Sequence, residues 1–189
     1  MSRSPSTAGA WLFPALVAGQ AALRLVELGV SARNERRTSG ERAAASRYPL
    51  MVAAHCALFA APLIEVRLRR RTRFDARWAG LLVATNALRW WVIATLGRRW
   101  NTRAIVPGDL TPATDGPYRF VRHPNYIAVA LEFLSLPMAG GATISALALS
   151  LLDAAILFDR IREEERLLSR NQAWRRAFAR RARLIPGIF

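Results

Sequence analysis

The stretch Gly116-Pro117-Tyr118-Arg119-Phe120-Val121-Arg122-His123-Pro124-Asn125-Tyr126 sets polar and aromatic residues directly before an apolar run. A turn is expected at Gly116-Pro117, and a helix is predicted to begin near Pro124, because proline suits a first helical turn. The imidazole of His123 then lies beside the unpaired backbone N–H groups of that helix. This stretch, the junction motif, therefore indicates either a site for a polar ligand or an interfacial loop facing lipid headgroups.

The composition indicates a membrane protein. The chain has 189 residues, is 52% hydrophobic and carries a net charge of +15, and all of its basic residues except the two histidines are arginines. Apolar segments alternate with short arginine clusters, as in helical membrane proteins with interfacial loops. No nucleic-acid partner is expected, since the positive charge flanks apolar spans instead of covering a polar domain. The single cysteine, Cys56, excludes an intrachain disulfide or a cysteine cluster, and no metal site is predicted.

The expected fold is all-α, a polytopic helical membrane protein with about five transmembrane helices in one domain, residues 1–189. Residues 1–96 are expected to form three spans on the substrate side. Residues 97–189 are expected to hold the junction motif, a C-terminal helical hairpin and an interfacial or cytoplasmic helix. The expected spans are residues 10–30, 48–66, 78–96, 127–138 (extended if the helix begins near 124) and 142–158.

The expected topology conflicts with the charge rule at one loop. Five spans with the C-terminus inside place the Arg67–Arg73 cluster outside the cytoplasm, whereas arginine-rich loops usually face inward. The sequence leaves this conflict open. The loop at residues 97–115 holds the turn formers Pro107, Gly108 and Pro112 and delivers the chain to the junction motif.

Charged and polar residues inside the expected spans permit two interpretations. Arg24 and Glu27 share a helix face, so they form an interfacial pair or face a cavity. His55 is either a hydrogen-bonding residue between helices or a catalytic group. Arg89 and Glu132 also interrupt apolar runs, and intramembrane charge is costly unless it is paired or used.

An acidic cluster follows the expected hairpin. Glu163, Glu164 and Glu165 interrupt an arginine-rich segment, and Arg160 lies one helical turn before Glu164. A solvated charged helix is the simpler interpretation. However, the hairpin returns this helix to the membrane face of the junction motif, which favours a ligand site shared by the two segments.

These two segments resemble the isoprenylcysteine carboxyl methyltransferase family of integral membrane methyltransferases. The resemblance covers roughly the C-terminal half, through Gly116-Pro117-Tyr118-Arg119, Arg122-His123-Pro124-Asn125-Tyr126 and then Arg160-Ile161 with Glu164-Glu165 and Leu168. The N-terminal half is similar to the branch found beside bacterial type III polyketide synthases, which methylates alkylpyrones or alkylresorcinols. That finer likeness is carried by Arg24-Leu25-Val26-Glu27-Leu28, Ser31, Arg33-Asn34, Tyr48 and His55, although Arg47 stands where a histidine is expected.

The resemblance implies S-adenosylmethionine as the methyl donor, bound between the hairpin base and the C-terminal helix. The residues expected to bind it are Tyr118, Arg122, His123, Pro124, Asn125, Tyr126, Arg160, Glu164 and Glu165. It further implies a multi-pass protein of the bacterial inner membrane with the cofactor site facing the cytoplasm. The expected partners are a lipophilic small-molecule acceptor, membrane lipids and, functionally, a type III polyketide synthase.

Catalysis of methyl transfer to oxygen depends mainly on positioning, because the sulfonium is already activated. A hydroxypyrone is largely ionised near neutral pH, so an arginine suffices to orient its oxyanion, and Arg103 and Arg89 are the candidates. A resorcinol needs a base, for which His55 and Glu132 are the candidates.

Three other functions stay open at this point. The first is prenylcysteine carboxyl methylation, and the second is an NADPH-dependent membrane reductase of the sterol reductase type, which shares the Arg-His-Pro-Asn-Tyr region. A reductase is expected to have a longer chain and an acidic residue soon after Tyr126, where Ile127-Ala128 follows. The third is a non-catalytic membrane protein that binds lipid or stabilises a synthase.

Overall fold

The computed structural model describes residues 11–38, 40–43, 45–70, 73–106 and 111–185, to which every structural statement below refers. Arg71, Pro107 and Gly108 lie outside these residues. The long helices are α1 (Leu12–Glu35), α2 (Tyr48–Leu68), α3 (Ala76–Leu96), α4 (Pro124–Ala139) and α5 (Thr143–Leu168). The short elements are β1 (Glu41–Arg42), η2 (Ala45–Arg47), η3 (Gly97–Arg99), β2 (Ile105–Val106), η4 (Gly116–Arg119) and α6 (Gln172–Phe178).

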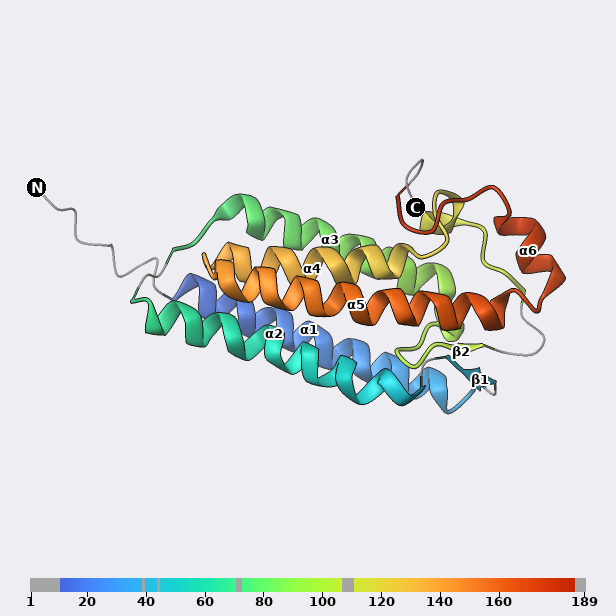
Figure 1. Cartoon of the computed structure of the whole chain (residues 1–189), viewed down its shortest axis with the longest axis horizontal. Helices are drawn as coiled ribbons and strands as arrows, with labels where there is room; N and C mark the ends of the chain where they lie inside the picture. Colours follow the sequence, from blue (N-terminus) through green and yellow to red (C-terminus); the bar gives the residue numbers. More distant parts are fainter. Residues whose placement is uncertain (1–10, 39, 44, 71–72, 107–110, 186–189) are drawn as a thin grey trace, which may run out of the picture.

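The long helices lie lengthwise in an elongated bundle (Figure 1). Helix α4 begins at Pro124, as the sequence predicts, and packs chiefly against α3 and α5. The side chains of Phe133 and Leu136 are completely buried, and Phe13 and Leu58 join them in the same core. The helical fold class is confirmed, with one small addition: β1 and β2 pair as an antiparallel two-stranded sheet.

Three helices are long and apolar enough to cross a membrane, and all three belong to the N-terminal half. They are Leu12–Glu35, Tyr48–Leu68 and Ala76–Arg99. Their outer faces expose large apolar side chains such as Leu25 (70% exposed), as expected where lipid surrounds a protein. Helix α4 has 16 residues, which is roughly 24 Å at 1.5 Å per residue, so the prediction of about five spans stays a prediction for α4 and α5.

Two helix boundaries differ from the sequence-based expectation. Helix α1 continues to Glu35, through residues expected to begin a polar loop, because no glycine or proline occurs between Ser31 and Glu35. Helix α5 is continuous from Thr143 to Leu168, so the second arm of the expected hairpin and the following acidic segment form one helix. Gly140 and Gly141 connect α4 to α5, and Phe13 fills the space where a Cβ of Gly140 would lie.

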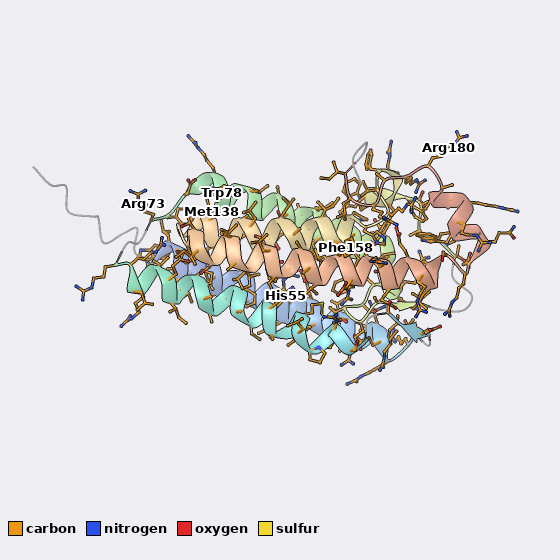
Figure 2. The ribbon with its side chains drawn as sticks, in the orientation of Figure 1. His55, Arg73, Trp78, Met138, Phe158 and Arg180 are labelled. Carbon is orange, nitrogen blue, oxygen red and sulfur yellow. The ribbon has the colours of Figure 1, made fainter. Side chains whose placement is uncertain are left out.

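The two ends of the bundle have different roles. The α2–α3 connection and the α4–α5 turn lie at one end, where the carboxylate of Glu65 accepts hydrogen bonds from the backbone N–H groups of Ile144 (3.1 Å) and Ser145 (2.7 Å). The loops between α1 and α2 and between α3 and α4, together with α6, lie at the other end (Figure 1). Figure 2 shows Arg73 at the first end, Arg180 at the second and His55 between them.

Candidate active site

A cavity of about 450 Å³ extends from the α6 end into the middle of the bundle. All five long helices and the loops around β2 and η4 contribute to its wall. Trp174 and Phe178 of α6 mark its outer end, whereas Phe59 of α2 and Asp153 of α5 lie at its inner end. The cavity therefore connects the polar loops to an intramembrane region.

The junction motif is held in place from both sides. Gly116 has a φ of 54°, a backbone conformation that favours glycine, and a Cβ there would collide with Thr95 of α3. On the other side, the backbone N–H of Arg122 donates to the carbonyl of Ala182 (2.9 Å), and that of His123 donates to the carbonyl of Arg183 (3.0 Å). The segment after α6 therefore returns to support the motif, which the sequence analysis did not foresee.

Tyr126 joins the motif to the acidic cluster. Its hydroxyl donates to Glu164 and accepts from Nε of Arg160 at 2.9 Å. The remaining nitrogens of Arg160 reach the carbonyl of Thr102 and, at 2.9 Å, the sulfur of Met51. The distant segments that the sequence analysis paired therefore meet through side-chain hydrogen bonds.

Glu164 and Glu165 occupy different environments. Glu164 lines the cavity, and Tyr126 is its hydrogen-bond partner among the described residues, so one carboxylate oxygen has no protein donor there. Glu165 lies outside the cavity wall and accepts from Arg122 (3.3 Å), His123 (3.3 Å) and Arg183 (2.8 Å). Glu164 therefore has an oxygen available to a ligand in the cavity, whereas Glu165 is engaged by residues of the junction motif and by Arg183.

The ionisation of Glu165 gives a testable pH dependence. Burial alone raises the pKa of Glu165, but hydrogen bonds from His123 and Arg183 outweigh it and lower the pKa from 4.5 to about 2. Because the folded-state pKa is depressed, the stabilisation is complete above the unfolded value of 4.5 and is lost as the pH falls through about 2. We expect Glu165→Gln to lower the Tm at about pH 5, and to lower it by less as the pH falls below about 4.5. Thermal unfolding at several pH values measures this, and a difference that does not shrink below about pH 4.5 would contradict it.

Among the other residues expected to bind the cofactor, Tyr118, Arg122, His123 and Asn125 line the cavity, whereas Pro124 is absent from its wall as described. His123 is stacked on Tyr126 with ring centroids 5.4 Å apart. Burial raises the pKa of Tyr118 above its usual range, so its hydroxyl stays protonated. Asn125 lines the cavity and its Oδ1 has no hydrogen-bond partner among the described residues.

Charged residues from three helices form a buried cluster at the inner end. Glu132 of α4 is completely buried and accepts from Gln20 (2.7 Å), from two nitrogens of Arg24 and from Arg89 (3.1 Å). Arg24 also pairs with Glu27. Glu132 is absent from the cavity wall as described, and both of its oxygens are occupied. We therefore assign it to holding the two guanidinium groups instead of to accepting a proton.

His55 has the geometry of a base that faces the cavity. Its Nδ1 lies 2.9 Å from the carbonyl of Met51, and because a carbonyl can only accept, Nδ1 carries the proton. Nε2 then has a free lone pair and makes no hydrogen bond with any described residue. The ring packs edge-on against Phe133, with centroids 5.0 Å apart, which fixes its orientation.

The two candidate arginines lie in different places. Arg89 lines the cavity and is 4% exposed. Arg103 pairs with Glu35 at 3.0 Å and covers the ring of Tyr48, and the described cavity wall does not include it.

Sequence reasoning overlooked four residues of the cavity wall: Met51, Asp153, Trp174 and Phe178. The signal for Asp153 was a lone carboxylate in an apolar run.

The chain is similar to known proteins. Residues 78–170 match the sequence model of the isoprenylcysteine carboxyl methyltransferase (ICMT) family. The uncharacterized protein YpbQ of Bacillus subtilis is 30% identical over 164 residues, which cover 84% of this chain and 95% of YpbQ. The family match spans the junction motif, the α4–α5 pair and the acidic cluster, the segments that build the outer cavity. The chain belongs to the isoprenylcysteine carboxyl methyltransferase family of membrane proteins.

Proposed function

We propose that the chain is an S-adenosylmethionine-dependent O-methyltransferase whose acceptor is a lipophilic molecule in the membrane, namely an alkylpyrone or alkylresorcinol-type polyketide. The observation that carries the proposal is one cavity whose wall includes both Glu164 and His55. A carboxylate with an unused oxygen and a histidine with an unused lone pair therefore face the same space. The family supports methyl transfer, and the geometry of His55 supports oxygen as the acceptor atom.

The residues at the outer end fit S-adenosylmethionine. The free oxygen of Glu164 is suited to accept hydrogen bonds from an ammonium group, and Trp174 and Phe178 offer aromatic faces to a cation. Asn125 Oδ1 and Trp100 Nε1 are buried without a hydrogen-bond partner among the described residues, and both residues line the cavity. When bound, this cofactor supplies a methyl group on a positively charged sulfur.

His55 provides the proton acceptor that a phenolic oxygen needs. Met51 links it to the outer end, because its sulfur contacts Arg160 while its carbonyl accepts from His55. In the proposed reaction, the acceptor hydroxyl gives its proton to Nε2 of His55.

An apolar route to the cavity supports a lipophilic acceptor. Leu25, Leu28 and Val52 line the cavity and are also 70%, 47% and 42% exposed on the outer faces of α1 and α2. An alkyl chain in the bilayer can occupy the space between these helices while its polar head reaches His55. We place the opposite, outer end of the cavity on the cytoplasmic side of the bacterial inner membrane.

Prenylcysteine is the second candidate acceptor, as the family name suggests. At the inner end its carboxylate needs an unpaired cation, but Arg24 there is bound to Glu27 and Glu132, and Arg89 is bound to Glu132. This pairing favours a neutral hydroxyl over a carboxylate.

A functional link to a type III polyketide synthase, which would supply such a hydroxyl compound, is part of the proposal.

Cofactor choice is the direct test of the reaction class. We expect the purified protein in lipid nanodiscs to bind labelled S-adenosylmethionine and to be unaffected by NADPH. Equilibrium binding of both cofactors to the same preparation measures this. NADPH binding without S-adenosylmethionine binding would establish a reductase, and binding of neither would favour a non-catalytic lipid-binding protein.

A further inference from the structure

Asp153 is an unpaired acid in the middle of the bundle. It lies on α5, is 2% exposed and lines the cavity. It makes no hydrogen bond or ion pair with any described residue, and its Oδ2 is also shielded from solvent. Burying a carboxylate without partners is unfavourable, so the fold gains nothing from this side chain.

Two neighbouring side chains carry unused polar atoms as well. Oε1 of Glu27 on α1 and Nε of Arg89 on α3 lack hydrogen-bond partners among the described residues. These two side chains lie 3.9 Å apart. All three residues line the cavity. Three helices therefore bring two unused acceptors and one unused donor to its inner end.

The buried cluster does not need these three atoms to hold the helices together. Glu132 already joins α1, α3 and α4 by accepting from Gln20, Arg24 and Arg89. Polar groups that are buried, unpaired and not required for packing are expected where a ligand completes their hydrogen bonds.

We propose that Glu27, Arg89 and Asp153 bind a second oxygen substituent of the methyl acceptor while the reacting oxygen lies at His55. This inference rests on the proposed function and specifies the acceptor as a ring with two oxygen substituents, of the 5-alkylresorcinol type. A hydroxyl is the matching group, because it donates to a carboxylate and accepts from a guanidinium.

The charges of the inner end support a hydroxyl instead of a carboxylate. Arg24 and Arg89 are already balanced by Glu27 and Glu132, and Asp153 adds a further acidic group. Asp153 is therefore a specificity-determining residue at the inner end of the acceptor site.

Equilibrium binding of three probes tests this assignment without relying on turnover. The probes are a 5-alkylresorcinol, a 3-alkylphenol and a 3-alkylbenzoate with the same alkyl chain. We expect the wild-type protein in nanodiscs to bind the resorcinol at least about 10-fold more tightly than the phenol, as one well-placed hydrogen bond to a charged group allows. The benzoate is expected to bind least tightly.

Asp153→Leu is expected to remove the preference for the resorcinol and to leave S-adenosylmethionine binding unchanged. Its Tm is expected to rise by at least about 2 °C, because an unpaired buried carboxylate is replaced by an apolar group. Asp153→Asn, which keeps the shape of the side chain, is expected to weaken the preference. Asp159→Asn is the matched control on α5, because Asp159 pairs with Arg47 and its side chain is 43% exposed; it is expected to keep the preference.

Equal affinity of the wild type for resorcinol and phenol would overturn the inference, as would a preference that survives Asp153→Leu. A Tm that falls in both Asp153 variants, with loss of cofactor binding, would show a structural role and would also overturn it. Failure of the proposed function is separate: resorcinol preference without methyl transfer from S-adenosylmethionine would leave the oxygen site intact and refute O-methylation.

Discussion

Glu164→Ala is expected to lower kcat/KM for methyl transfer at least about 100-fold, equivalent to about 2.7 kcal/mol of lost binding, because it removes a charged hydrogen-bond acceptor from the cofactor site. Glu164 lines the cavity. One of its carboxylate oxygens accepts from the hydroxyl of Tyr126, and the other has no donor among the described residues. The loss should appear as weaker S-adenosylmethionine binding in an equilibrium titration.

Glu163→Ala is the matched control for this variant. Glu163 is adjacent in sequence but pairs with Arg166 at 3.3 Å, and its side chain is 46% exposed. We expect full activity and unchanged cofactor affinity in this variant. Unchanged turnover in Glu164→Ala, with a native Tm in both variants, would refute the proposed cofactor site.

His123→Ala is expected to reduce turnover too, through loss of its stacking on Tyr126 and its contact with Glu165.

His55→Phe is expected to lower kcat for an alkylresorcinol by about 100-fold or more, the usual contribution of a positioned base. The reason is that Nε2 of His55 has no partner among the described residues, whereas Nδ1 is fixed by the carbonyl of Met51. Affinity for S-adenosylmethionine should stay within about twofold, since His55 lies away from Glu164 along the bundle. Steady-state rates with saturating cofactor measure the change.

The acceptor itself provides the control for His55→Phe. A hydroxypyrone is already ionised near neutral pH, so its methylation should decrease much less than that of the resorcinol. An equal loss with both acceptors would show that His55 positions the ring and does not take a proton. No loss with either acceptor would remove His55 from the reaction.

Local patterns were sufficient to predict most of the helices. The start of α4 at Pro124 follows from the suitability of proline for a first helical turn. A family resemblance implied one pocket between the junction motif and the acidic cluster, and the structure brings Tyr126 and Glu164 of these segments into hydrogen-bond contact. Leu12–Glu35 and Tyr48–Leu68 overlap spans expected from hydropathy alone.

The inner half could not be predicted, because its partners are distant in sequence. Glu132 binds Gln20 and Arg24, more than one hundred positions earlier, and no local signal indicates such a contact. The sequence suggested Glu132 as a base and Arg103 as an anion-orienting group. In the structure Glu132 is saturated with donors, and Arg103 is paired with Glu35, so the candidates that face the cavity are His55 and Arg89.

Asp153 illustrates a different limit of sequence reasoning. A single acid in the apolar run of α5 is visible in the sequence, but its lack of a partner becomes evident only when the surrounding helices are in place. The role of the segment after α6 also becomes evident only in the folded chain, because this segment accepts backbone hydrogen bonds from Arg122 and His123 of the junction motif.

The most direct test of the central claim is product mass after incubation with S-adenosylmethionine that carries an isotope-labelled methyl group. Alkylpyrones, alkylresorcinols and prenylcysteines are offered to the protein in nanodiscs. We predict that an alkylpyrone or alkylresorcinol gains one labelled methyl group, and that Glu164→Ala loses this product. Methylation of prenylcysteine alone would contradict the proposed acceptor, and no labelled product from any of the three would contradict the proposed methyl transfer to them.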